Sequence, residues 1–364
     1  MPVYITFILP THNEDKNIIS LIEEIISLNK QYLVEIIVVD DNSNDRTQSL
    51  VREFSKNDRK VRLINRVGRY GLSSAICEGC LNATGEIIAV MDSDGQHEVK
   101  SVYASIDYLL KSNNDLIIGS RFAKGSSIEG LSKKRKKGSS FANYFARFTL
   151  SKNYSHLSDF MSGCCAFNRN RCLKYLKKID VSGFKFLYEL LSISEGKLKV
   201  DEIPLNFQSR KYGYSKLDYA VIWDFFISAF HTLTRRLIPR RAISFGFVGA
   251  TGILVHLFVV YFLLAITKLT FVQALPFAGV SAASSNFLIN NFLTFRNARL
   301  QGVDLISGLI KFLIVSSIPL LANVGLASSF YQYVTPNKFL SQMAGIIVVF
   351  IWNYAASSKL VWNT

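Results

Sequence analysis

Two carboxylates two positions apart form the group in this sequence that is best suited to chemistry. Asp92 and Asp94 follow the apolar run Glu86–Val90, which reads as a buried strand, and Gln96 comes two positions later. Oxygen ligands of these kinds suit Mg²⁺ or Mn²⁺, ions that prefer to share a site with the phosphates of a substrate. The pattern therefore predicts a metal–diphosphate site. The alternative is a solvated acidic turn after a strand, and the rest of the chain must decide between the two.

The elements that must position these side chains alternate between strands and helices. Apolar runs predict strands at 3–9, 35–39, 61–65, 86–90 and 115–119, and helical patterns follow from near residues 18, 45, 72 and 99. Asp45 is expected to cap the second of these helices. This alternation predicts an α/β fold with a mainly parallel, doubly wound sheet. Polar residues gather after the strands, which is where such a sheet binds its ligand.

The second part of this domain is less regular. Residues 122–138 are polar and basic and predict a mobile loop, which a helix over 141–150 follows. A short strand is expected at 164–167, a helix over 183–194 and a last strand at 199–207. The segment Leu217–Ile238 has apolar and aromatic residues at helical spacing, with arginines near its end, and this profile predicts an interfacial helix or helix pair.

Beyond Arg241 the composition changes, because charges nearly vanish over long runs. Four apolar segments, at about 243–266, 271–295, 308–333 and 339–358, are each long enough to cross a hydrocarbon core, which takes about 20 helical residues. The second is the least apolar and should face other helices, because it carries Ser284, Ser285, Asn286, Asn290 and Asn291. The positions of the basic residues around the spans predict that both termini, and with them the N-terminal domain, are cytosolic.

The net charge of +15 narrows the range of partners. Basic residues cluster at 133–137 and 235–241 without an aromatic–basic recognition motif, so anionic lipid head groups are the expected partner and nucleic acid is not. The five cysteines include only one C-x-x-C, so we expect buried thiols in a reducing compartment rather than a zinc site.

The motifs of the chain, taken together, resemble those of the family 2 (GT-A fold) glycosyltransferases. Within that family they resemble the polyprenyl-phosphate sugar transferases of the dolichol-phosphate mannose synthase type. Residues 243–362 look like the four-span GtrA-type domain. The resemblance divides the chain into a GT-A domain (1–216), amphipathic interfacial helices (217–241) and a transmembrane domain (242–364). The motifs that carry it are Pro10-Thr11-x-Asn13-Glu14, Asp40-Asp41-x-Ser43-x-Asp45-x-Thr47, Gly71-Leu72-x-x-Ala75, Asp92-x-Asp94-x-Gln96-His97, Gly119-Ser120-Arg121, Asp159-x-x-Ser162-Gly163 and Arg210-x-x-Gly213-x-Ser215-Lys216.

The resemblance also implies roles for individual residues. Asp94 and Gln96 are the expected metal ligands, with Asp92 bridging through the metal or the sugar hydroxyls, and His97 is expected to be a polar loop residue. The catalytic set is Asp92, Asp94, Arg121 and Arg210. The acceptor phosphate is expected at Arg121, Arg135, Ser215 and Lys216. The nucleotide sugar is expected at Pro10, Thr11, Glu14, Val39, Asp40, Asp41, Asp92, Ser93, Asp94, Gln96, Arg121, Lys185, Arg210 and Lys216.

For several of these residues a purely structural or surface role is the alternative to a functional one. Glu14 could be only a helix-start carboxylate, which the helix dipole favours. Arg135 lies in a basic run that could be a solvated or lipid-facing loop. Lys185 and Glu189 could line the site or lie on a surface helix. Asp40 is expected to bind the base or the ribose of the nucleotide.

The function that the resemblance implies is metal-dependent, inverting transfer of a hexose to dolichyl or polyprenyl phosphate at the cytosolic face of a membrane. GDP-mannose is the favoured donor, but UDP-glucose or another nucleotide sugar fits the motifs equally. A processive polysaccharide synthase is disfavoured because the chain lacks a Gln-x-x-Arg-Trp motif. A more remote alternative is a non-catalytic lipid-sugar flippase or membrane anchor. The transmembrane domain could also form a homo-oligomer interface.

Overall fold

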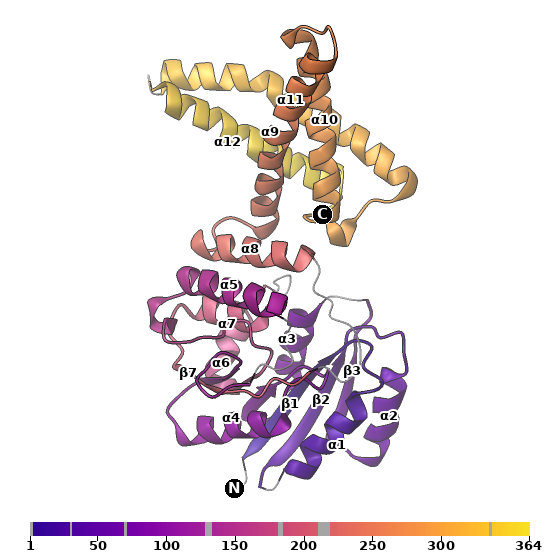
Figure 1. Ribbon diagram of the computed structural model, residues 1–364, viewed down its shortest axis with the longest axis vertical. Helices are drawn as coiled ribbons and strands as arrows, with labels where there is room; N and C mark the ends of the chain where they lie inside the picture. The colour runs from indigo at the N-terminus through magenta and orange to yellow at the C-terminus, as the bar shows by residue number, and fades with distance from the viewer. Residues whose placement is uncertain are drawn as a thin grey trace. The chain divides into compact units, whose positions relative to one another are not determined.

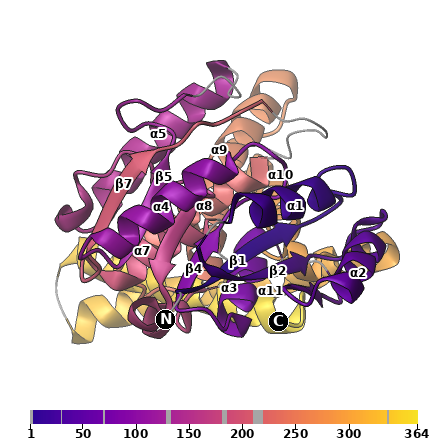
Figure 2. The ribbon, with the colours of Figure 1, turned by 90° about the horizontal axis from the view of Figure 1, so that it is seen from below.

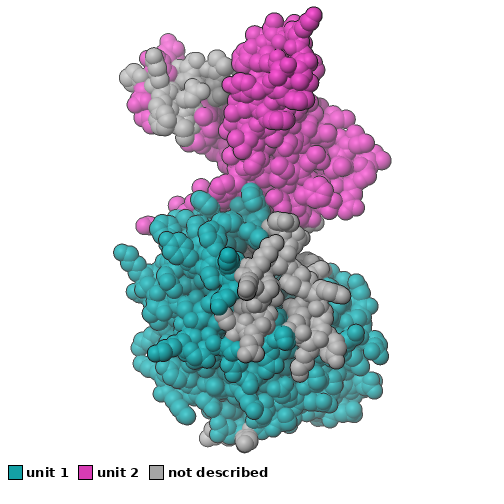
Figure 3. Space-filling view, viewed as in Figure 1, with its two compact units in different colours: residues 1–233 teal, residues 234–364 magenta. Residues whose placement is uncertain are grey.

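The computed structural model describes residues 3–29, 31–68, 71–127, 133–180, 185–209, 219–334 and 337–364. The chain forms two compact units, residues 1–233 and 234–364 (Figure 3). The division into three parts expected from the sequence stays a prediction. The helix in the expected interfacial segment, 217–241, belongs to the first compact unit, and residues 210–218 lie outside the described residues.

The first unit is built on a seven-stranded sheet in the order β3-β2-β1-β4-β6-β5-β7. Figure 1 shows its strands β1, β2 and β3 side by side. All neighbours are parallel except that β6 is antiparallel to both β4 and β5. The predicted mainly parallel α/β sheet is therefore confirmed. The strands are β1 (Tyr4–Thr11), β2 (Leu33–Asp40), β3 (Val61–Asn65), β4 (Ile87–Val90), β5 (Leu116–Ser120), β6 (Cys165–Asn168) and β7 (Val200–Pro204).

Helices cover both faces of the sheet because the strands are apolar on both sides (Figure 2). Along β1, Phe7 and Leu9 pack with one group of helices and Ile8 packs with the other, as the two-residue period of a strand requires. The first group is α1 (Ile18–Leu28), α2 (Thr47–Asn57) and α4 (Val99–Lys111). The second is α3 (Leu72–Asn82), α5 (Lys133–Thr149), α6 (Arg169–Leu176), α7 (Phe186–Ser194) and α8 (Tyr219–Leu233).

Three local expectations were wrong. Residues 133–138, which were expected to be loop, form the first turns of α5, because Lys and Arg are good helix formers even in a highly basic run. The residue before α2 is Arg46 and not Asp45, although the Asp45 carboxylate still accepts a hydrogen bond of 2.9 Å from the Thr47 N–H. The surface-helix reading of Glu189 also fails, because Glu189 is fully buried on α7.

The second unit consists of α9 (Arg240–Ile266), α10 (Phe271–Phe292), α11 (Gly302–Tyr333) and α12 (Lys338–Leu360). These helices coincide closely with the four predicted spans. In the described residues, α9 and α10 satisfy both the length and the apolarity of a membrane span, and the apolar part of α12 is shorter, Ala344–Leu360.

The polar face of α10 turns toward other segments of this unit, as predicted. A Cβ at Gly252 of α9 would lie 2.5 Å from the Asn286 amide nitrogen, so the two helices touch there. Asn291 accepts a 3.0 Å hydrogen bond from the Trp362 indole and donates one of 3.1 Å to the Leu300 carbonyl. The two hydrogen bonds of Asn291 satisfy an amide group that would be costly in lipid.

Candidate functional site

The predicted site residues meet at one edge of the sheet because parallel strands end together. β1 ends at Thr11 and its neighbour β2 at Asp40. β4 pairs with β1 and is followed by Asp92, and β5 is followed by Arg121. Because β6 is antiparallel, its start lies at this same edge, so the preceding segment from Asp159 to Gly163 joins the site.

Asp92 is the least satisfied carboxylate at this edge. Its Oδ1 is buried and has no hydrogen-bond partner among the residues that the structure describes. A Cβ at Gly163 would lie 2.8 Å from the Asp92 Cγ, so the carboxylate packs directly on the glycine. A buried carboxylate oxygen without a donor is costly, and such a group in a native protein calls for a bound ion or ligand.

The next residues of the motif are held by the backbone and by neighbouring strands. The Ser93 hydroxyl donates to the Pro10 carbonyl at 2.9 Å and lies 3.2 Å from the Thr11 hydroxyl. Asp94 is buried and accepts a hydrogen bond of 3.1 Å from the Gln96 N–H. The Gln96 amide nitrogen donates to the Gln208 carbonyl at 3.2 Å, so the amide oxygen remains as the acceptor of that side chain.

This donor set fits Mg²⁺ or Mn²⁺. Two carboxylates with an amide oxygen, one carboxylate oxygen being buried and unpartnered, suit an ion that keeps several positions for water and substrate phosphates. Among the described residues, no group of three or more His, Cys, Asp or Glu side chains that could hold a metal ion is found. Asp92, Asp94 and Gln96 are the candidate ligands because of their oxygen atoms, and their role as metal ligands stays a prediction.

Asp40 and Asp41 are both buried, and both carboxylates already hold local structure. Asp40 accepts hydrogen bonds from the Ser43 N–H at 2.9 Å and from the Gln48 amide at 2.8 Å. Asp41 pairs with the Arg66 guanidinium at 2.6 Å and accepts the Gly71 N–H at 2.9 Å. Gly71 has a φ of 94°, which favours glycine in the turn that opens α3. The nucleotide-binding role of the two aspartates stays a prediction.

The remaining wall of the predicted donor site is formed by the ends of β1 and β2. Pro10 and Val39 are paired neighbours in these strands. Glu14 lies just before α1, and its carboxylate accepts a hydrogen bond of 2.7 Å from Asn17, while its N–H donates to the Thr47 hydroxyl at 2.9 Å. The structure thus ties the loop after β1 to the start of α2.

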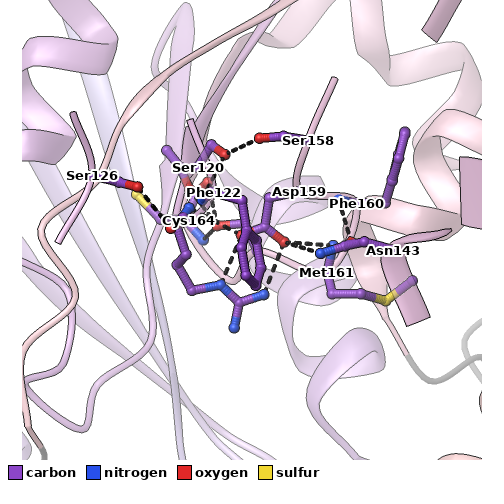
Figure 4. A network of polar contacts seen from close by, with 12 residues as sticks. Ser120, Phe122, Ser126, Asn143, Ser158, Asp159, Phe160, Met161 and Cys164 are labelled. Atoms are coloured by element: carbon purple, nitrogen blue, oxygen red, sulfur yellow. Dashed lines mark hydrogen bonds and ion pairs between the residues drawn. The ribbon is translucent and has the colours of Figure 1, made fainter. Parts of the chain in front are cut away.

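Arg121 and Asp159 form a buried bidentate ion pair. The Arg121 Nε and Nη2 donate to the two Asp159 carboxylate oxygens at 2.7 and 2.8 Å. The network around Asp159 extends to Met161 and, on α5, to Asn143 (Figure 4). Burial by itself would raise the pKa of Asp159, but the adjoining guanidinium outweighs it and the pKa is lowered. Burial likewise opposes the charge of Arg121, yet Asp159 and, to a lesser degree, Asp92 raise its pKa.

The chain is similar to known proteins over both of its compact units. The family model "Glycosyl transferase family 2" matches residues 6–176, and the model "GtrA/DPMS, transmembrane domain" matches residues 244–362. The polyprenol monophosphomannose synthase of Mycolicibacterium smegmatis is 30% identical over 217 residues, which is 58% of this chain and 79% of that protein. The chain belongs to glycosyl transferase family 2.

Two further relatives are similar to this glycosyltransferase over different parts of its length. The dolichol-phosphate mannosyltransferase of Pyrococcus furiosus is 29% identical over 363 residues, 99% of each chain. The dolichyl-phosphate beta-glucosyltransferase ALG5D of Trichomonas vaginalis is 33% identical over 130 residues, 33% of this chain and 40% of that protein. Among solved structures, glucosyl-3-phosphoglycerate synthase from Mycobacterium tuberculosis with Mn²⁺, UDP-glucose and phosphoglyceric acid is 18% identical with a TM-score of 0.49, over 65% of this chain and 81% of that chain.

Some residues predicted for the glycosyltransferase site belong to parts of the chain outside the described residues. Arg210, Ser215 and Lys216 lie outside the described residues, and so does the side chain of Arg135, whose backbone belongs to α5. Lys185 is half-buried immediately before α7, and its nucleotide-binding role stays a prediction.

Three residues of the site were given no functional role from the sequence. Asp159 and Gly163 belong to a motif that was noted, but only the antiparallel direction of β6 brings them to Arg121 and Asp92. His97 was interpreted as a polar loop residue, yet it is 3% exposed, and its Nδ1 accepts a hydrogen bond of 3.2 Å from the Asp92 N–H. The signal for His97 was its place directly after the acidic motif.

Proposed function

We propose that this glycosyltransferase moves one hexose, best assigned as mannose from GDP-mannose, to dolichyl or polyprenyl phosphate with inversion at the anomeric carbon. The observation that carries the proposal is the buried, unpartnered Asp92 oxygen at the same edge of the sheet as the buried Arg121 guanidinium. A site that combines these features can take a metal-bound diphosphate and a phosphate acceptor side by side. The full-length similarity to a dolichol-phosphate mannosyltransferase supports this assignment.

The donor side of the site is acidic. Asp92, Asp94 and Gln96 would hold Mg²⁺ or Mn²⁺, which when bound neutralises the charge that develops on the departing nucleoside diphosphate. The hydrogen bonds of Ser93 to Pro10 and of Asp94 to the Gln96 N–H fix the motif loop before substrate arrives. Such preorganisation avoids rearrangement of the loop during the reaction.

The acceptor side needs cations instead of a general base. A phosphomonoester is already ionised near neutral pH because its second pKa is about 6. Asp159 holds the Nε and Nη2 of Arg121, which leaves the Nη1 end of the guanidinium as the part not committed to that pair. We assign this end to an acceptor or donor phosphate oxygen, with Arg135, Arg210, Ser215 and Lys216 as further phosphate contacts. Attack on the face opposite the diphosphate converts an α-linked donor into a β-linked product.

Two helices of the first unit suit a lipid substrate. α5 and α8 pack through Phe145, whose ring lies 6.0 Å from that of Phe225. The side chains of Phe141, Tyr144 and Phe148 recur at helical spacing on α5 and are 57%, 74% and 75% exposed. Exposed aromatic side chains beside a basic run are typical of helices at a membrane surface.

A transfer assay tests the proposal. Purified full-length protein would receive Mn²⁺ or Mg²⁺, a polyprenyl phosphate and either labelled GDP-mannose or labelled UDP-glucose. We expect labelled lipid from GDP-mannose, loss of labelling with EDTA or in Asp94→Ala, and unchanged labelling in the control Glu53→Gln, whose side chain is exposed on α2. NMR of the product should show the β anomer. Absence of lipid labelling from both nucleotide sugars would favour the flippase or anchor alternative instead.

UDP-glucose is the alternative donor substrate. The similarity to a dolichyl-phosphate beta-glucosyltransferase over 130 residues supports it. The same assay separates the two, because labelling from only one donor identifies the sugar.

We also propose that the catalytic domain and both termini face the cytosol. The basic residues flanking the predicted spans support this orientation. Labelling of single cysteines introduced at Lys268 and Arg299 in sealed vesicles tests it. Inside-out vesicles should expose the residue-299 cysteine to an impermeant reagent and protect the residue-268 cysteine, and the reverse pattern would contradict the proposal.

A further inference from the structure

A short segment after β7 connects two loops of the site. The Gln208 N–H donates to the Gln96 carbonyl at 2.9 Å, next to the pairing of His97 with Phe207. The Phe207 N–H donates to the Ser127 carbonyl at 2.8 Å. The segment around Phe207 therefore joins the loop that carries the metal-binding motif to the loop that follows β5 and Arg121.

The first of these loops contains His97, which orients the backbone of Asp92. Because the His97 Nδ1 accepts the Asp92 N–H, the proton of the neutral ring is on Nε2. That Nε2 lies 3.9 Å from the Asp92 Oδ2. Rotation of the His97 ring would therefore release the backbone N–H of a residue assigned to the metal.

The side chain of Phe207 contacts both His97 and Arg121. Its ring makes an edge contact with the His97 ring at a centroid distance of 5.6 Å. The Arg121 Cζ lies over the Phe207 ring, 5.7 Å from its centroid. Phe207 is 5% exposed, so the ring is enclosed and both contacts are largely removed from water. An aromatic ring can attract a guanidinium at its face and pack with another ring at the same time.

We infer that Phe207 is a positioning residue that couples the metal-binding motif to the phosphate-binding arginine. Through His97 it supports the backbone of Asp92. Its ring face contacts the Arg121 guanidinium, which Asp159 holds by hydrogen bonds and over which Phe122 lies at the same 5.7 Å. The inference rests on the proposed function, because it assigns the two contacts to the donor side and the acceptor side of that site. Loss of the ring should weaken both sides together.

Binding and kinetics of Phe207→Leu provide the first test. Leu keeps an apolar side chain but removes the aromatic contacts. Phe7→Leu is the matched control, since the Phe7 ring is fully buried and makes an edge contact with Tyr103 at a centroid distance of 5.3 Å. This contact lies outside the site. We expect Phe207→Leu to weaken calorimetric binding of Mn²⁺ with a nucleoside diphosphate, and to raise the KM for polyprenyl phosphate, each by about fivefold, a size typical of aromatic and cation–π contacts. Phe207→Tyr, which keeps the ring, should stay within about twofold of wild type for the same reason.

A double-mutant cycle tests the coupling itself. The kcat/KM effects of His97→Asn and Arg121→Lys should be non-additive in the wild-type background and additive in the Phe207→Leu background. If Phe207→Leu changes only the unfolding temperature, as Phe7→Leu would, or if the non-additivity survives it, the inference is overturned. Failure of the proposed function would appear differently, as wild-type protein that labels no lipid.

Discussion

Carboxylates with buried oxygen atoms lie at both ends of the same sheet, and their surroundings differ. At the amino end, Glu35 accepts hydrogen bonds from Thr6 at 2.6 Å and from Thr84 at 2.9 Å, and pairs with Arg62 at 2.7 Å. At the carboxyl end, Asp92 keeps a buried oxygen without a partner in the described part of the chain. A buried carboxylate whose oxygens all have hydrogen-bond partners stabilises the fold. A buried carboxylate oxygen without a partner costs stability and indicates a ligand. The carboxyl end is therefore the functional end.

Asp159 combines features of both kinds of carboxylate. Both of its oxygens accept hydrogen bonds from Arg121, yet it lies at the functional end of the sheet. Asp159→Asn leaves the buried Arg121 charge without its partner, which should cost about 3–5 kcal/mol of unfolding free energy. It should also disorder the guanidinium assigned to phosphate. We expect a lower thermal midpoint together with lost transfer activity, measured in the same detergent preparation. Unchanged activity would remove Arg121 from the site.

Asp92→Asn should separate function from stability. Removing the charge should lower kcat/KM on the order of 10²–10³-fold, the cost typical of losing one electrostatic group in a site. The unfolding temperature should be unchanged or higher, since a buried unpaired oxygen no longer carries charge. A large drop in stability would instead place Asp92 among the structural carboxylates.

Gly163→Ala tests the packing beneath Asp92. A methyl group there would overlap the Asp92 carboxylate and must displace it. We expect about a tenfold to hundredfold loss of kcat/KM, since a shift of roughly 1 Å at a catalytic group costs that much. Gly249→Ala on α9, where a Cβ meets nothing within 4 Å, is the matched control and should retain activity. Equal activity of both variants would contradict the assignment.

Glu35→Gln should affect the fold alone. Burial would raise the pKa of Glu35, but hydrogen bonds from Thr6 and Thr84 and the Arg62 charge lower it overall. A lowered folded-state pKa stabilises the protein above the unfolded value and loses that contribution as pH falls through the folded value. Glu35→Gln should cost about 1–3 kcal/mol at pH 7, and the difference from wild type should shrink below about pH 4, near the ordinary carboxyl pKa. Denaturation at pH 7 and pH 3 measures this. The kcat/KM should stay within about twofold of wild type, because Glu35 lies at the end of the sheet opposite to the site.

Much of the fold could be predicted because local patterns were strong. The expected bounds of β3 and the expected starts of α3 and α4 match the structure. The motifs after β1, β2 and β4 were placed at one edge because parallel strands share a direction. The contribution of Asp159 and Gly163 could not be predicted, because a four-residue strand such as β6 shows no sign of its direction in its sequence. The burial of His97 likewise depends on Phe207, a partner 110 positions away in the chain.

The insertion of β6 between β4 and β5 also has a consequence for the order of assembly. β4 is synthesised 75 residues before β6, the strand that must cover its open edge, as the last residue of one (90) and the first of the other (165) show. At about 5–20 residues per second, the edge waits roughly 4–15 s for its partner during synthesis. During that interval the nascent chain carries Asp92 but not the glycine on which it packs, and an apolar strand edge is open to wrong pairing.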